Sequence, residues 1–142
     1  MKIEELHSYS SSQFADLRRL QEELTSRVVL TETLLRAVVD DANSHMYVLV
    51  DGERIVGCAT RCVFHSPTGR KASVEDVVVL SAYRGQGLGR MLVEHVIGEA
   101  RRLAPIELQL TSKPSRVAAN GLYQSLGFER KETNCYRMTV GE

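Results

Sequence analysis

The chain lacks the long apolar segments of membrane and secreted proteins and the excess positive charge of many nucleic-acid-binding proteins. Its 18 basic residues are balanced by 18 acidic ones, and its longest unbroken apolar run is Met46–Val50. That run is far too short to span a bilayer, and Met1–Glu5 contains no apolar signal-peptide core. We therefore expect a cytoplasmic protein that does not contact a membrane. A net charge of zero also argues against nucleic-acid binding through a broad positive field.

The cysteines, histidines and prolines give no sign of a disulfide framework, a metal site or a linker. The three cysteines do not form a disulfide framework, and the four histidines are scattered without metal-ligand spacing. We expect no metal. Only three prolines occur, and we find no repeat or linker. With 43% hydrophobic and 25% charged residues, the composition is that of a globular protein, and we expect one domain over residues 1–142.

The most informative segment runs from Val77 to Leu92. An apolar strand leads through a short turn into Gly85-Gln86-Gly87-Leu88-Gly89, and an amphipathic helix follows directly. Backbone N–H groups at such a helix start point into open space, with the positive end of the helix dipole behind them. The three glycines allow a positive φ and a close backbone approach. The segment predicts a phosphate or pyrophosphate site, with Arg84 as an adjacent positive charge.

Two other phosphate-binding loops do not fit this segment. A P-loop closes with Gly-Lys-Ser/Thr, whereas Gly89 is followed by Arg90-Met91. A dinucleotide-binding fold requires Gly-x-Gly-x-x-Gly near the start of a βαβ unit, with an acidic residue about 20 positions later. Here the glycine spacing differs and the loop lies deep in the chain.

The segment Arg84–Gly89 instead resembles the pyrophosphate loop of the GNAT superfamily, the acyl-CoA-dependent N-acyltransferases, whose signature is Arg/Gln-x-x-Gly-x-Gly/Ala. A second segment, Ala119–Phe128, is similar to the family's Ala-x-x-Leu-Tyr-x-x-x-Gly-Phe block. Glu75–Val79, before the loop, is similar to the same strand of glucosamine-6-phosphate N-acetyltransferases, a branch of this family. The resemblance covers residues 73–128 and implies acetyl-CoA as co-substrate. It places the cofactor contacts at Val77, Val78, Val79, Arg84, Gly85, Gln86, Gly87, Leu88, Gly89 and Arg90.

The order of elements agrees with this resemblance. Hydrophobic spacing predicts strands at 3–6, 46–50, 55–64, 72–80 and 106–110, and helices at 12–25, 31–42, 88–103 and 114–126. We expect Ser11 or Ser12 to cap the first helix, Leu34 and Leu35 to face inward, and one or two further strands in 128–140. The fold class is α+β: a central mixed, mostly antiparallel sheet with about four flanking helices. The resemblance implies that the strand before the loop splays from its neighbour.

Candidate catalytic residues lie in the strand before the loop and in the last helix. By resemblance, Tyr123 is the general acid that protonates the leaving thiolate. Glu75 and Asp76 place two carboxylates within an apolar strand, where charge needs a partner or a function. We expect Glu75 to be the base, with Asp76 second; a salt bridge is the rival interpretation. In a regular strand the two face opposite sides, so both cannot act without a bulge.

Arg116 and Asn120 share one face of the last helix with Tyr123. We assign both as candidate cofactor contacts, with exposure to solvent as the alternative. Arg116 occupies a position where many members of the superfamily have Asn, so the resemblance does not define its contact. Asn120 lies in a different register from that Asn.

We therefore expect direct transfer of an acetyl group to a primary amine of a small-molecule or peptide acceptor. The sequence does not identify the acceptor, and it leaves open whether the chain forms a homodimer. A non-catalytic acyl-CoA-binding regulatory module is the alternative, and a protein-interaction domain is the third hypothesis.

Overall fold

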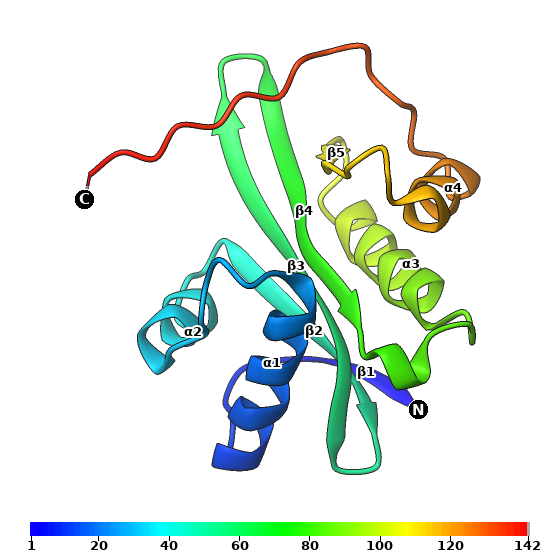
Figure 1. The fold of residues 1–142 in the computed structure, drawn as a ribbon. Coiled ribbons are helices and arrows are strands. Elements are labelled where there is room, and N and C mark those ends of the chain that lie inside the picture. The colour runs from blue at the N-terminus through cyan, green and yellow to red at the C-terminus, as the bar shows by residue number, and fades with distance from the viewer. Residues whose placement is uncertain (142) are drawn as a thin grey trace. The chain divides into compact units, whose positions relative to one another are not determined.

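The computed structural model describes residues 1–141 and divides the chain into two compact units, Met1–Thr111 and Ser112–Glu142 (Figure 1). The first unit carries the sheet, two α-helices on one face of it and one on the other. The second unit carries one α-helix. The expectation of a single domain over 1–142 stays a prediction.

The sheet of the first unit confirms the predicted α+β class. Its five strands are β1 (Lys2–Glu5), β2 (Ser44–Asp51), β3 (Arg54–Ser66), β4 (Gly69–Val79) and β5 (Glu107–Gln109), in the order β1-β2-β3-β4-β5. The first four strands pair antiparallel, and β5 pairs parallel to β4. The central strands β2 and β3 carry runs of consecutive buried residues, so both of their faces are buried.

The helices α1 (Ser11–Leu24) and α2 (Glu32–Val39) cover one face of the sheet, and α3 (Leu88–Arg101) covers the other (Figure 1). Leu17, Leu20 and Leu35 of α1 and α2 pack on one buried cluster with Ile55 and Val78. A second cluster lies under α3 and contains Tyr47, Leu49, Val56, Ala59, Val74, Val79, Leu88, Leu92 and Val96. The helices on each side bury their apolar faces against the sheet, and this burial stabilises the three-layer arrangement.

Two local expectations about α1 and α2 are wrong. The N-cap of α1 is Ser10, not Ser11 or Ser12. The Ser10 hydroxyl accepts a hydrogen bond from the Gln13 N–H at 3.2 Å, and the Gln13 side chain accepts one from the Ser10 N–H at 2.8 Å. This reciprocal capping box outweighs the other two serines. In α2, Leu35 is buried but Leu34 is 45% exposed, because this short helix turns only one stripe toward the sheet.

A buried carboxylate joins α1 to the start of β3. Asp16, whose side chain is 7% exposed, accepts a hydrogen bond from the Ile55 N–H at 3.0 Å. Arg54 Nε lies 3.1 Å from the same carboxylate. Because a buried charge needs partners of this kind, Asp16 holds α1 on the sheet.

The second unit departs further from the expected elements. Helix α4 runs over Val117–Ser125 with Arg116 as N-cap, so the expectation that Pro114 opens it is wrong. No strand is assigned in residues 128–141, contrary to the predicted one or two. Tyr136, Met138 and Val140 alternate with polar residues, yet they are 87%, 84% and 88% exposed. An alternating pattern is not sufficient for a strand, which also needs a partner for its backbone hydrogen bonds.

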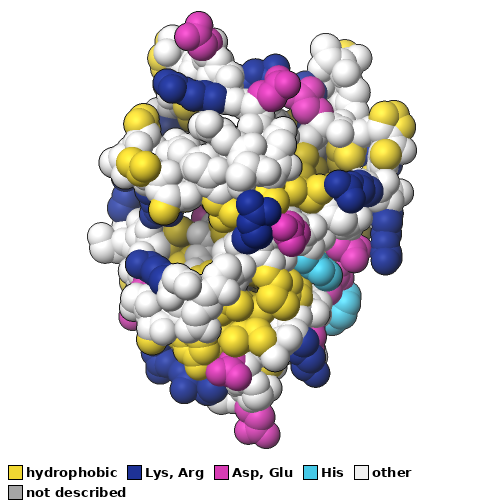
Figure 2. All heavy atoms as spheres, turned by 90° about the vertical axis from the view of Figure 1, so that its right-hand side faces the viewer, with side chains coloured by type: hydrophobic (Ala, Val, Ile, Leu, Met, Phe, Trp, Pro, Cys, Tyr) yellow, Lys and Arg dark blue, Asp and Glu magenta, His cyan; other side chains and the backbone are white. Residues whose placement is uncertain are grey.

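The surface agrees with the balanced composition. On the face shown in Figure 2, Lys and Arg side chains are interspersed with Asp and Glu. Among residues 1–141, no helix combines the length and the apolar character that crossing a membrane requires.

Candidate active site

The glycine-rich loop joins β4 to α3 through a short 3-10 helix, η1 (Ser81–Tyr83). Gly85 has φ 79° and Gly87 has φ 75°, and a Cβ built on either meets no atom within 4 Å. Gly87 is the N-cap of α3 and offers no side chain to its first turn. The first hydrogen bond there runs from the Met91 N–H to the Gly87 carbonyl. The N–H groups of Leu88 and Gly89 thus point out of a helix start that no side chain caps.

The residues of the loop do not all contribute in the expected way. Gly89 lies inside α3 and, unlike Gly85 and Gly87, does not use a positive φ. The Leu88 side chain is buried among the core residues under α3, so only its backbone is available to a ligand. Arg90 pairs with Glu94 at 3.1 Å. An anion here would meet backbone N–H groups, with the helix dipole adding to their effect.

Arg84 is oriented by contacts on two sides. Its Nε donates a hydrogen bond to the Val79 carbonyl at 3.2 Å, and its Nη2 lies 3.5 Å from Glu23 Oε2 of α1. Glu23 also accepts hydrogen bonds from the Ser81 N–H and hydroxyl, both at 3.0 Å. Nothing in the sequence indicates this contact, because 58 positions separate Glu23 from Ser81.

Tyr83 fixes the other side of η1. Its hydroxyl donates a hydrogen bond to Asp51 Oδ2 at 2.8 Å, and Asp51 ends β2. This bond raises the pKa of Tyr83 above its ordinary value, since it favours the protonated phenol. The sequence contains no pattern that predicts this pair.

The strand before the loop has one open edge. β5 pairs with β4 only at Lys71, Ala72 and Ser73, so within residues 1–141 the run Val74–Val79 is paired on its β3 side alone. This agrees with a strand that splays from its neighbour. On this open side the Val79 carbonyl accepts a hydrogen bond from Arg84, but no strand in the described part of the chain supplies partners for the N–H groups along Val77–Val79, which an extended ligand can use.

A bulge lies in the middle of β4. Thr60 of β3 pairs with Glu75 and Cys58 with Val78, so Asp76 and Val77 together oppose Ala59. Asp76 has φ 53°, a left-handed conformation that is rare outside glycine. In a regular strand Glu75 and Asp76 would face opposite sides, so both carboxylates can act only with such a bulge.

The bulge changes which residues face α3. Val74 and Val77 both pack on the cluster under α3, although they are three positions apart in the strand. The alternation is therefore reset between them, and Glu75 and Asp76 are the pair that this face leaves out. The bulge thus leaves two consecutive carboxylates outside the face that packs under α3.

The two carboxylates differ in their surroundings. Glu75 accepts a hydrogen bond from the Ser73 hydroxyl. Although Asp76 is an exposed residue, local desolvation raises the pKa of its carboxyl, and the neighbouring charge of Glu75 raises it further. The surroundings of Asp76 therefore favour the protonated form of its carboxyl.

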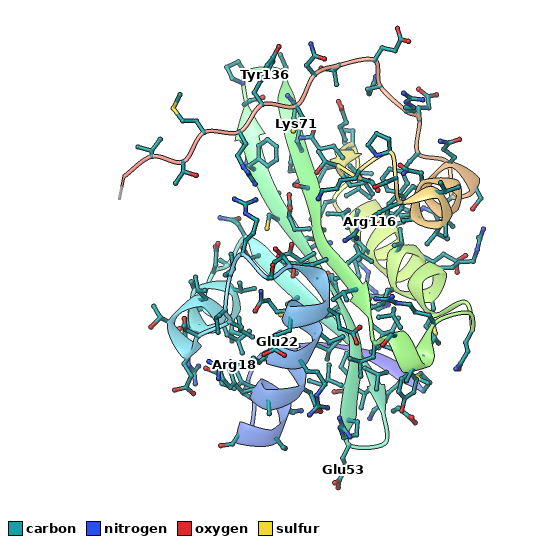
Figure 3. All side chains as sticks on the ribbon, viewed as in Figure 1. Arg18, Glu22, Glu53, Lys71, Arg116 and Tyr136 are labelled. Atoms are coloured by element: carbon teal, nitrogen blue, oxygen red, sulfur yellow. The ribbon has the colours of Figure 1, made fainter. Side chains whose placement is uncertain are left out.

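In the second unit, Arg116, Asn120 and Tyr123 lie on α4 or at its start (Figure 3 labels Arg116). The Asn120 amide donates hydrogen bonds to the carbonyls of Lys113 and Arg116, at 2.9 and 2.8 Å. It therefore stabilises the start of α4. Burial raises the pKa of Tyr123, and the charge of Arg116 lowers it. The Tyr123 ring packs edge-to-face on Phe128, with centroids 6.0 Å apart.

Among residues 1–141, no group of three or more His, Cys, Asp or Glu side chains could hold a metal ion. The candidate site combines a glycine-rich loop before α3, an open strand edge and a pair of adjacent carboxylates. These three features fit a ligand with a pyrophosphate and an extended amide-containing arm.

The chain belongs to the acetyltransferase (GNAT) family, whose family model matches residues 6–128. It is similar to the [ribosomal protein bS18]-alanine N-acetyltransferase of Escherichia coli K12, with 38% identity over 73 residues, 50% of this chain and 49% of that protein. It is also similar to human N-acetyltransferase 8B, with 29% identity over 99 residues, 68% of this chain and 44% of that protein. The chain therefore spans about half the length of these curated relatives.

A solved aminoglycoside acetyltransferase from an uncultured soil metagenomic sample, in complex with sisomicin, has the same fold. The TM-score is 0.84 at 20% identity, covering 99% of this chain and 96% of that chain.

Proposed function

We propose that this protein transfers an acetyl group from acetyl-CoA directly to a primary amine. The observation that carries the proposal is the loop: Gly85 and Gly87, both at positive φ with open space where a Cβ would lie, lead into the uncapped start of α3. Such a loop accommodates a pyrophosphate. Family membership supports the same activity.

When bound, acetyl-CoA supplies a thioester, whose carbonyl carbon forms the new bond to the amine nitrogen while the bond to sulfur breaks. The open edge of β4 supports this step, because backbone N–H groups of Val77–Val79 can donate hydrogen bonds to a carbonyl oxygen that gains negative charge. Direct transfer needs no nucleophilic side chain on the protein.

The carboxylates of Glu75 and Asp76 serve the amine. A lysine-like amine has a pKa of about 10.4 and is almost fully protonated at neutral pH, so it must lose a proton before it attacks. A carboxylate binds the ammonium and accepts that proton, directly or through water. Asp76 is one candidate acceptor, because its pKa is raised. Glu75, which accepts a hydrogen bond from the Ser73 hydroxyl, is the other.

Tyr123 is the proposed acid that returns a proton to the departing sulfur. Its raised pKa keeps the phenol protonated at neutral pH, so the hydroxyl is available as a donor. Since an ordinary thiol has a pKa of about 8.5, full transfer from this phenol is uphill. A strong hydrogen bond from the Tyr123 hydroxyl to the sulfur would stabilise the departing thiolate without complete proton transfer.

The relatives suggest which amines to test. The bacterial relative is named for the alanine of a ribosomal protein, and the solved neighbour contains an aminoglycoside. An acceptor panel therefore includes a peptide with N-terminal alanine, a lysine peptide, an aminoglycoside and an amino sugar.

The experiment is calorimetric titration with acetyl-CoA and with CoA, followed by thiol release against this panel. Binding with acceptor-dependent thiol release supports the proposal. Binding without turnover would favour the non-catalytic acyl-CoA-binding module, and no binding by folded protein would refute both.

A further inference from the structure

The segment between β4 and α3 is held by side chains from elements distant in sequence. Glu23 of α1 meets three donors, namely the Ser81 N–H, the Ser81 hydroxyl and the guanidinium of Arg84. The Glu23 side chain is 27% exposed and the Arg84 side chain 59% exposed, so the three contacts lie at the surface. Hydrogen bonds to a charged carboxylate are stronger than neutral ones.

The donors occupy the two ends of the turn that precedes the glycines. Ser81 opens η1, and Arg84 directly precedes Gly85. Arg84 also donates back to the Val79 carbonyl at the end of β4. A single carboxylate thus sets the path of the backbone from β4 to the first glycine and orients the cation beside the loop.

On its other side, the turn is tied to the β2–β3 hairpin by the bond from Tyr83 to Asp51. The contacts of Glu23 and the bond from Tyr83 to Asp51 together fix the backbone position from which the glycines start, although glycine itself can adopt many backbone conformations. Preorganisation of this kind increases affinity, because less chain entropy is lost when the ligand binds.

We propose that Glu23 is a positioning residue for the pyrophosphate loop, holding Ser81 and Arg84 so that the N–H groups of the loop are preorganised for acetyl-CoA. This inference rests on the proposed function. It has a clear rival: a carboxylate near a phosphate site repels the ligand. If repulsion dominates, removal of Glu23 tightens binding instead of weakening it.

Glu22 provides the matched control. It is the preceding residue of α1 (Figure 3), it is exposed, and no hydrogen bond or ion pair joins it to any residue that the structure describes. Glu22→Ala and Glu23→Ala therefore remove the same charge from adjacent positions of one helix, but only Glu23→Ala removes the contacts with the loop.

The test is calorimetric titration of wild-type and variant proteins with acetyl-CoA, at a temperature well below each melting temperature. We expect Glu23→Ala to weaken the affinity about tenfold, the loss of one or two charge-assisted hydrogen bonds, and Glu22→Ala to stay within about twofold. Glu23→Gln keeps one acceptor oxygen for Ser81 and should fall between Glu23→Ala and wild type. Ser81→Ala, which removes one donor and keeps the carboxylate, should weaken binding about threefold.

Three results overturn the inference: equal affinities for Glu23→Ala and Glu22→Ala, an affinity of Glu23→Ala or Glu23→Gln above that of wild type, or a lower melting temperature of Glu23→Ala without a loss of affinity. The last would make Glu23 a purely structural residue. Failure of wild-type protein to bind acetyl-CoA would instead overturn the proposed function, and this inference with it.

Discussion

Substitution of Gly87 by alanine separates the backbone requirement of the loop from its role in binding. Gly87 has φ 75°, and a Cβ there meets no atom within 4 Å. The alanine is therefore strained by the left-handed backbone alone, by about 1–2 kcal/mol. For a chain of this size that strain lowers the melting temperature by roughly 3–8 °C. We expect acetyl-CoA affinity to fall at least about tenfold, since the methyl group enters space beside the uncapped N–H groups.

Gly98→Ala is the matched control for this substitution. Gly98 lies within α3, is not among the glycines of positive φ, and also has nothing within 4 Å of its Cβ position. Alanine in a helix interior is favoured over glycine by about 0.5–1 kcal/mol. The same chemical change should therefore raise the melting temperature by roughly 2–4 °C and leave binding unchanged.

The assay combines thermal unfolding of the three proteins with calorimetric titration below their melting temperatures. Gly87→Trp, which fills the loop, should abolish binding while the fold survives. Wild-type affinity in Gly87→Ala would refute the assignment of the loop. A melting temperature of Gly87→Ala equal to that of Gly98→Ala would refute the argument from φ, whatever the binding result.

Three further predictions concern residues outside the loop. Tyr123→Phe should slow thiol release at least about tenfold with little change in acetyl-CoA affinity; an unaltered rate would remove its role as acid. The raised pKa of Asp76 means that the folded protein keeps this proton to higher pH than the unfolded chain, so its contribution to stability is lost as pH rises from the ordinary value through the raised pKa. Asp76→Asn should abolish this pH-dependent loss of stability, and it should also abolish the rise of activity with pH on the acidic side of the profile. Glu75→Gln should keep that rise. The opposite pattern would make Glu75 the base. Asp16→Ala, which leaves Arg54 and the Ile55 N–H without their acceptor, should lower the free energy of unfolding in urea by about 2–4 kcal/mol, and a loss below about 0.5 kcal/mol would show that this contact does not anchor α1.

The features that could be predicted from sequence are those encoded within a few neighbouring residues. The glycine-rich loop and α3 follow from glycine spacing and a 3.6-residue apolar period, and the structure confirms both. The hairpin at Asp51-Gly52 follows from turn chemistry, with Gly52 at φ 61°. The Ser10–Gln13 capping box is also local and could have been recognised from its Ser-x-x-Gln spacing.

The features that could not be predicted depend on contacts between distant segments. Glu23 is one of two adjacent glutamates on α1, and only the folded sheet brings it to Ser81. The alternation of Tyr136, Met138 and Val140 looks like a strand, but whether it becomes one depends on a partner strand elsewhere. Such pairings carry no local signal, which explains why the predicted strands in 128–140 were wrong.

The bulge at Asp76 links the chemistry of β4 to its geometry. Two residues of β4 oppose Ala59 there, and a bulge bends the strand that carries it and increases its twist. Pairing with β5 ends at Ser73, so the bulge lies within the open edge along Val74–Val79. Glu75 and Asp76 therefore lie on a stretch of β4 that has no partner strand on one side within the described residues. Under the proposed function, the carboxylate that serves the amine and the N–H groups that serve the carbonyl oxygen come from one stretch of β4, and a variant that restores regular pairing there should impair both.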